Sequence, residues 1–141
     1  MKILCLPTDL REKIRAHCVA SYPHEACGLL LGQGDKVTHM VPSPNLSDQP
    51  TRNFDIDPAL IIQHQKAGRE GSEQIVGHYH SHPDGQAMPS AQDQAQNYDK
   101  DLIWVIVQVT DGVAQDIKAF ATASETGQLE TGQLTAILLN P

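Results

Sequence analysis

The chain has 141 residues, of which 40% are hydrophobic and 19% are charged, and its formal net charge is −7. This length suffices for one domain with a hydrophobic core and is short for two, so we expect a single domain over residues 1–141. Because lysines and arginines form no cluster, the negative charge argues against nucleic acid or an anionic membrane as a partner. The sequence also lacks the apolar run of roughly 18 residues that would indicate a transmembrane helix.

Cysteine use and the first residues of the chain indicate the compartment. Cys5, Cys18 and Cys27 are odd in number and lack C-x-x-C spacing, which argues against a disulfide framework or a cysteine zinc site. Residues 1–7 carry one basic side chain and an apolar run too short for a signal peptide. We therefore expect a cytoplasmic protein.

The first third of the chain predicts a strand, a helix and a strand hairpin. Apolar residues at helical spacing follow Thr8 or Asp9, either of which can cap a helix. This helix should end near Tyr22, because Pro23 disfavours helix in the residue before it. The expected elements are a strand at 1–6, a helix from 8 or 9 to about 22, and strands at 26–32 and 37–41.

A loop rich in proline at 42–51 leads into the rest of the predicted fold. Asp57-Pro58 is a typical helix start, and Asp111-Gly112 is a typical hairpin turn. Strands with helices packed on them make an α/β or α+β layered structure, which is the fold class that we expect. The expected elements are a short strand at 52–56, helices at 57–69 and 90–97, and strands at 74–80, 101–109, 115–121 and 134–139.

The motif with the clearest chemistry is His80-Ser81-His82 followed, after a seven-residue gap, by Ser90 and, after two more residues, by Asp93. Side chains alternate along a strand, so His80 and His82 project to one face. Ser90 begins the following helix, which places Asp93 on its first turn. Two imidazoles and a carboxylate are good zinc ligands, and a fourth position left to water makes such a site catalytic. The motif therefore predicts one Zn²⁺ per chain on His80, His82 and Asp93.

Two residues near this motif have more than one interpretation. His78 shares the strand face of the two motif histidines, so it is either a further ligand or a packed histidine. Cys27 lies in an apolar run, which favours a buried small side chain over a nucleophile.

A hydrolase also needs a proton acceptor that can pass its proton to the leaving nitrogen. The local motif contains no such group. Glu25 is the best candidate, because it lies at the mouth of the apolar strand 26–32, where a solvated glutamate is uncommon.

The complete pattern resembles that of the JAMM (MPN+) metalloprotease family. The resemblance runs from the first expected helix to the strand that ends at 109, and so covers most of the chain. It implies a three-layer fold, similar to cytidine deaminase, with a mixed central β-sheet flanked by helices. The residues that carry the resemblance are Glu25, His80, Ser81, His82, Pro83, Ser90 and Asp93.

The resemblance also implies a role for each residue of the site. His80, His82 and Asp93 would hold Zn²⁺, and Glu25 would position and deprotonate the attacking water. Ser90 would donate to the oxyanion of the tetrahedral intermediate, and the alternative is that it serves only as a helix cap. Members of the family cut peptide or isopeptide bonds just after the tail of ubiquitin or of a ubiquitin-like protein.

The short chain is most similar to the free-standing bacterial branch, which trims the C-termini of ubiquitin-like sulfur-carrier proteins. The implied substrate is such a carrier or its C-terminal adduct, with the segment 42–56, including Arg52 and Phe54, as a wall of its groove. Two alternatives are a non-catalytic scaffold that binds ubiquitin-like proteins and a zinc hydrolase of another small amide. The scaffold is disfavoured because the five functional positions of the motif are all present, namely Glu25, His80, His82, Ser90 and Asp93. A deaminase-like hydrolase is disfavoured because the signature Pro-Cys-x-x-Cys is absent.

Overall fold

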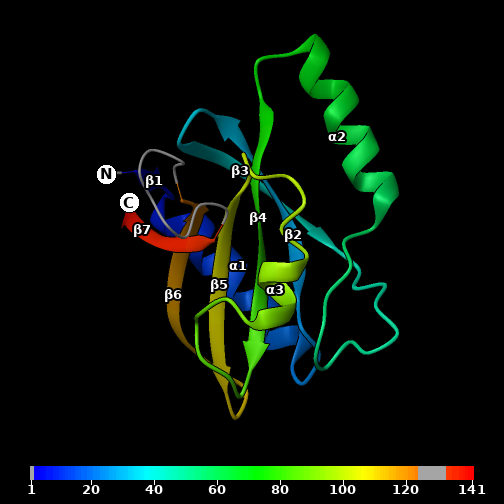
Figure 1. The fold of residues 1–141 in the computed structure, drawn as a ribbon, viewed down its shortest axis with the longest axis vertical. Coiled ribbons are helices and arrows are strands. Elements are labelled where there is room, and N and C mark those ends of the chain that lie inside the picture. Colours follow the sequence, from blue (N-terminus) through cyan, green and yellow to red (C-terminus); the bar gives the residue numbers. More distant parts are fainter. Residues whose placement is uncertain (1, 124–132) are drawn as a thin grey trace.

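The computed structural model describes residues 2–123 and 133–141, whose fold is shown in Figure 1. Among these residues, no helix has both the length and the apolar character needed to span a membrane. In chain order the elements are β1 (Ile3–Cys5), α1 (Thr8–Ser21), β2 (Cys27–Gln33), β3 (Lys36–Ser43), α2 (Pro58–Glu70), β4 (Gln74–Pro83), α3 (Ala91–Ala95), β5 (Ile103–Thr110), β6 (Val113–Thr122) and β7 (Leu134–Asn140).

The order and type of these elements agree with the predictions except at residues 52–56, which form no strand. Only an isolated bridge joins Asn45 to Ile56 in this part of the chain. The Asn45 side chain explains the difference, since its Oδ1 accepts hydrogen bonds from the N–H groups of Ser47 and Asp55, both at 3.0 Å. A side chain that satisfies backbone donors in this way takes the place of a strand partner.

Two of the three helix starts follow the predicted capping chemistry. Asp57 accepts a backbone N–H from the first turn of α2 at 2.9 Å, and Ser90 caps α3. Helix α1 begins directly after Pro7, which occupies the cap position and offers no side-chain hydrogen bond. The prediction that Thr8 or Asp9 caps this helix is therefore wrong, because both residues already lie within its first turn.

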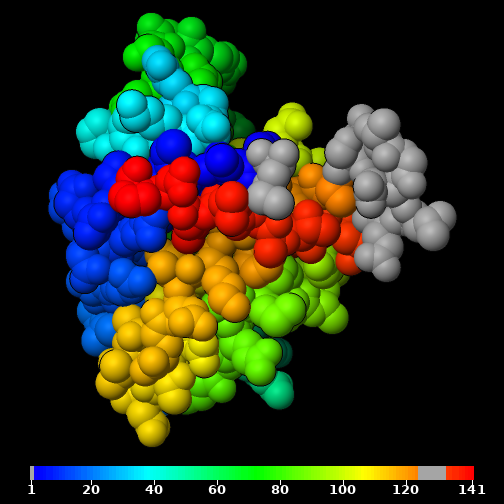
Figure 2. Space-filling view, turned by 90° about the vertical axis from the view of Figure 1, so that its left-hand side faces the viewer, coloured from blue at the N-terminus to red at the C-terminus, as the bar shows by residue number. Residues whose placement is uncertain are grey.

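The strands form one mixed sheet in the order β1-β3-β2-β4-β5-β6-β7, and parallel pairing of β7 with β1 closes it. Strand β4 lies in the middle, antiparallel to β2 and parallel to β5. Figure 2 shows β7 in red running between the blue N-terminal segment and the orange β6. The sequence predicted the mixed sheet but not its closure, because pairs such as Ile3 with Leu138 are set by tertiary packing alone.

The predicted hairpin turn at Asp111-Gly112 is confirmed. Asp111 has φ = 50° and Gly112 has φ = 78°, the positive values that a two-residue hairpin turn with the twist of the strands requires. Asp84, just after β4, is the other described non-glycine residue with positive φ, at 58°.

Helices α1 and α3 lie on opposite faces of the sheet (Figure 1). On the α1 face, Leu10, Ile14 and Cys18 pack against Tyr79 and Val105. This arrangement confirms a layered α/β fold with a mixed sheet flanked by helices. A second, smaller cluster on the face of α3 consists of Cys27, Phe54, Ala87, Trp104, Ile106, Phe120 and Leu134.

We expect the three cysteines to differ in reactivity. Burial raises the pKa of the Cys18 thiol and that of the Cys27 thiol to about 12, so both stay neutral at pH 8 and poorly nucleophilic. Cys5 is only half-buried. A disulfide reagent should label Cys5 first in the native protein and all three residues after unfolding in guanidinium. Equal rates at the three sites in native protein would contradict this burial pattern.

Candidate metal centre

Strand β4 sets the position of the two motif histidines. It is held on both sides, by β2 and by β5, and His80 lies opposite Cys27 on one neighbour and Ile106 on the other. His80 is fully buried, whereas His82, near the end of the strand, keeps part of its side chain exposed. The alternation of side chains brings both imidazoles to the face covered by α3, as predicted.

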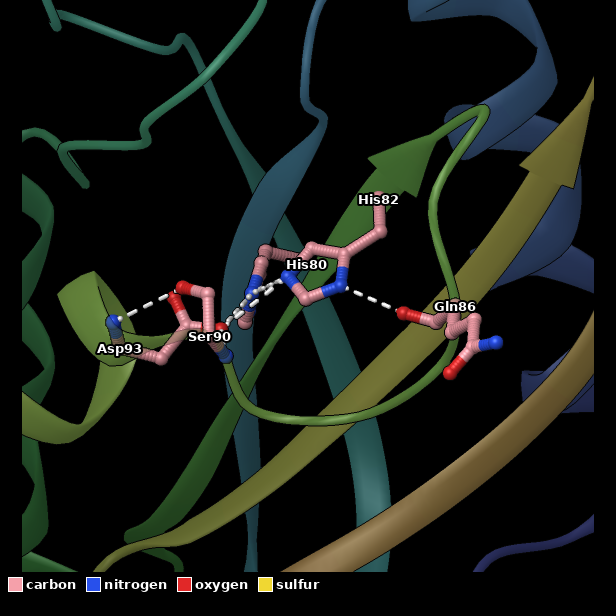
Figure 3. Close-up of polar contacts among 5 residues, drawn as sticks. All are labelled: His80, His82, Gln86, Ser90 and Asp93. Carbon is pink, nitrogen blue, oxygen red and sulfur yellow. Dashed lines mark hydrogen bonds and ion pairs between the residues drawn. The ribbon is translucent and has the colours of Figure 1, made fainter.

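Asp93 joins the two histidines, so that three ligand atoms converge (Figure 3). His80 Nε2 lies 3.0 Å from His82 Nε2, and Asp93 Oδ2 lies 3.3 Å from the first and 3.1 Å from the second. Zinc bonds of about 2.0–2.1 Å at tetrahedral angles would put ligand atoms about 3.3–3.4 Å apart. The observed separations therefore fit a small tetrahedral cation, and these three residues could hold one.

A backbone carbonyl orients the ring of His82. His82 Nδ1 lies 2.7 Å from the oxygen of Gln86 (Figure 3). A carbonyl only accepts hydrogen bonds, so Nδ1 carries a proton and the neutral ring presents the lone pair of Nε2 to its neighbours. A hydrogen bond of this kind is the usual support of a metal-binding histidine.

The capping box of α3 orients Asp93. Ser90 Oγ accepts a hydrogen bond from the Asp93 N–H at 3.0 Å, and Asp93 Oδ2 accepts one from the Ser90 N–H at 2.9 Å. The oxygen that faces the histidines is therefore the oxygen that the helix start fixes. Sequence spacing predicted this cap, and the structure brings Ser90 to the edge of the ligand group (Figure 3).

Charge is distributed unevenly over the three ligand residues. Burial alone would raise the pKa of Asp93, but the two imidazoles beside its carboxylate and the hydrogen bond from the Ser90 N–H outweigh it and hold that pKa well below its usual range. Burial lowers the pKa of His80, so this imidazole is neutral at pH 7. The site at neutral pH thus contains a fixed carboxylate and at least one neutral imidazole, the protonation states that metal binding requires.

Glu25 lies beside His82 across the sheet. Ala26 and Ser81 join the two segments, with Ala26 N–H donating to Ser81 Oγ at 2.8 Å and Ser81 N–H donating to the Ala26 carbonyl at 3.1 Å. The Glu25 carboxyl lies close enough to His82 for the charges of the two groups to interact. Glu25 is 5% exposed, and its Oε1 has no hydrogen-bond partner among the described residues. Burial raises the pKa of its carboxyl to about 7.

His78 stands apart from the ligand group, which consists of His80, His82 and Asp93. Its ring packs edge-on against Trp104, with ring centroids 4.5 Å apart. Burial lowers the pKa of His78 to about 3, so the ring is neutral. Of the two interpretations that the sequence left open, the structure supports the packed histidine.

Phe54 has a different position from the one that the sequence suggested. Its ring stacks on that of His80, with centroids 4.2 Å apart and an interplanar angle of 18°. It is buried in the cluster on this face and so lies under the metal site, instead of forming an exposed groove wall. His80 Nδ1 has no hydrogen-bond partner among the described residues, so packing against Phe54 and Trp104 orients this ring.

Comparison with known proteins agrees with this geometry. Residues 7–122 match the family described as prokaryotic homologs of the JAB domain. A probable TtuB-protein conjugate cleaving protease from Thermus thermophilus is 33% identical over 114 residues, which cover 79% of this chain and 73% of that protein. A CysO-cysteine peptidase from Mycobacterium tuberculosis is 28% identical over 120 residues, or 84% of this chain and 82% of that one. Tail tip assembly protein K from Escherichia phage N15 is 34% identical over 119 residues, 84% of this chain but only 45% of the phage protein.

Solved structures share the fold. The solution structure of a protein from Desulfitobacterium hafniense superposes with a TM-score of 0.77 at 27% identity, covering 98% of this chain and 91% of that one. A domain described as a metalloprotease-like zinc site in the proteasome and signalosome gives a TM-score of 0.56 at 17% identity, covering 100% and 98%. The family match over most of the chain, together with the 33% identity to the Thermus protease, shows that the chain belongs to the family of prokaryotic homologs of the JAB domain.

Proposed function

We propose that this protein is a zinc-dependent peptidase that hydrolyses the peptide or isopeptide bond directly after the C-terminal tail of a ubiquitin-like sulfur-carrier protein. The observation that carries the proposal is the convergence of His80, His82 and Asp93 next to the buried carboxyl of Glu25. Relatives named for the cleavage of TtuB conjugates and of CysO-cysteine support the choice of substrate.

One Zn²⁺ would be held by His80 Nε2, His82 Nε2 and Asp93 Oδ2. When bound, zinc supplies Lewis-acid chemistry, which lowers the pKa of a water molecule and polarises the scissile carbonyl. Gln86 contributes by holding His82 in the tautomer that leaves Nε2 unprotonated, and Phe54 by holding the ring of His80 in place.

Glu25 would act as the proton carrier of the reaction. It takes a proton from the attacking water and delivers it to the nitrogen that leaves. A carboxyl with a pKa of about 7 is suited to both steps at neutral pH, because it accepts and releases a proton with little free-energy change. Its carboxyl lies close enough to His82 and Asp93 to interact with both through their charges.

Ser90 would stabilise the negative charge that develops on the carbonyl oxygen. Its Oγ accepts the Asp93 N–H as the helix cap, and a hydroxyl that accepts a hydrogen bond can still donate its own proton. The cap and the oxyanion donor are therefore compatible roles for one residue, since each uses a different part of the hydroxyl group.

The metal assignment predicts that purified protein holds about one zinc per chain, because three converging ligands bind the ion tightly. The double variant His80→Ala/His82→Ala should lose it, as measured by elemental analysis after dialysis. A variant with His39→Ala and His64→Ala, which removes two histidines away from the site, is the matched control and should keep the zinc. Full retention of zinc by the first variant would reject these ligands.

The catalytic assignment predicts that Glu25→Gln keeps its zinc yet cleaves a carrier protein extended past its Gly-Gly end at least about 100-fold more slowly. Glutamine has the volume of glutamate but cannot take up a proton, so the loss isolates proton transfer. Cleavage is followed by mass spectrometry of the released segment. Undiminished turnover would remove Glu25 from the mechanism, and a wild-type protein that binds the carrier without cutting it would support the scaffold alternative instead.

Burial of Glu25 also predicts a pH dependence of stability in the metal-free protein. The folded-state pKa of about 7 exceeds the model-peptide value of 4.5, so the folded protein favours the neutral carboxyl. The unfolding free energy should therefore fall as pH rises from 4.5 to above 7, by on the order of 3 kcal/mol. Glu25→Gln should lack this component in urea unfolding, and an identical pH dependence in both proteins would contradict the burial of a titrating carboxyl.

A further inference from the structure

The turn after β4 provides the hydrogen-bond partner of His82. The Gln86 carbonyl lies 2.7 Å from His82 Nδ1, and the Gly85 N–H donates to the carbonyl of His82 at 3.3 Å. The partner is a main-chain oxygen, so substitution of the Gln86 side chain leaves it in place. Control of the His82 ring therefore depends on the residues that hold this turn.

Asp84 ties this turn to two segments that are distant in the sequence. Its Oδ2 accepts a hydrogen bond from the Tyr22 hydroxyl at 2.7 Å, just beyond the end of α1. Its Oδ1 accepts the Asp111 N–H at 2.9 Å, at the tip of the β5–β6 hairpin. Figure 2 shows the gold surface of this hairpin against the light-green segment that follows β4.

The backbone of Asp84 is held in an unfavourable conformation. Asp84 and Asp111 both have positive φ, at 58° and 50°, a region that non-glycine residues rarely adopt. The Asp111 N–H donates a hydrogen bond to Asp84 Oδ1, and the Asp84 N–H donates to the Val109 carbonyl at 2.6 Å. On the other side of Gln86, Ala87 is buried against the cluster beneath the site. The carbonyl that orients His82 is thus held from both ends.

We infer that Asp84 is a positioning residue for the metal centre. The hydrogen bonds that its carboxylate accepts from Tyr22 and Asp111 hold the turn in which the Gln86 carbonyl meets His82 Nδ1. The fixed turn keeps the Nε2 lone pair of His82 directed at the metal position. The inference rests on the proposed zinc function for its purpose, but the effect on the His82 ring exists in the metal-free chain as well.

The test compares Asp84→Gly with Asp84→Asn in the full chain. Glycine removes both carboxylate contacts and tolerates φ = 58° without strain. The variant therefore tests the loss of the carboxylate hydrogen bonds without changing the backbone conformation. Asparagine also tolerates this φ and keeps an acceptor oxygen for the Asp111 N–H. Its mass is checked before use, because an Asn-Gly pair deamidates.

Nitrogen-15 NMR of the metal-free proteins at pH 8.5 should find wild-type His82 protonated at Nδ1 and Asp84→Gly as a mixture of tautomers. Competition with a chelator should find zinc bound about 10- to 100-fold more weakly by Asp84→Gly, and within about threefold of wild type by Asp84→Asn. Ile14→Val, in the core on the other face, is the control for general destabilisation and should change neither readout.

An unchanged His82 tautomer together with zinc affinity within about twofold of wild type in Asp84→Gly would overturn the inference. If Asp84→Gly does not fold, Tyr22→Phe replaces it, since it removes only the hydroxyl that donates to Asp84. That variant should weaken zinc binding about threefold, and unchanged affinity in it would overturn the inference equally. Failure of the wild-type protein to bind zinc would reject the proposed function, whereas the tautomer comparison would still decide the role of Asp84.

Discussion

Three electron-rich atoms lie within 3.3 Å of one another at this site, and the rest of the structure depends on keeping them there. Lone pairs at this separation repel unless a proton or a cation lies between them. The chain holds them by backbone groups: β4 is fixed between two strands, the start of α3 fixes Asp93, and the Gln86 carbonyl fixes His82. Because none of these supports is a flexible side chain, the three atoms stay together without relying on exposed contacts.

Two carboxyl groups share this region and have opposite electrostatic surroundings. Asp93 accepts a hydrogen bond from the Ser90 N–H and faces two imidazoles, and it stays ionised. Glu25 is buried with one oxygen lacking a partner among the described residues, so its pKa rises to about 7. Such a separation of pKa values suits the roles proposed for the two groups, one as a fixed charge and the other as a proton carrier. The difference arises from hydrogen bonding, since both side chains are buried.

Most of the fold and the group formed by His80, His82 and Asp93 could be predicted from the sequence, because they depend on local patterns. Strand alternation paired His80 with His82, and helix capping brought in Asp93. Glu25 was found only through its place at a strand mouth and through family resemblance, since its approach to His82 depends on how β2 pairs with β4. Phe54 was misplaced for the same reason: its contact with the His80 ring depends on how the loop after β3 folds back, which Asn45 controls through hydrogen bonds that leave no periodic signal.

Closure of the sheet has a consequence for how the chain could be rearranged. Strands β1 and β7 pair directly, with Leu4 opposite Leu139 and Cys5 opposite Asn140, so the two ends of the described chain are neighbours. A short linker could therefore join them, and new ends could be opened at the β2–β3 turn, where Gly34 has φ = 60° and open space around it. Such a circular permutant would keep every strand pair next to β4. Because the sheet is closed, the point at which the chain starts could change while the positions of the residues around β4 stay the same.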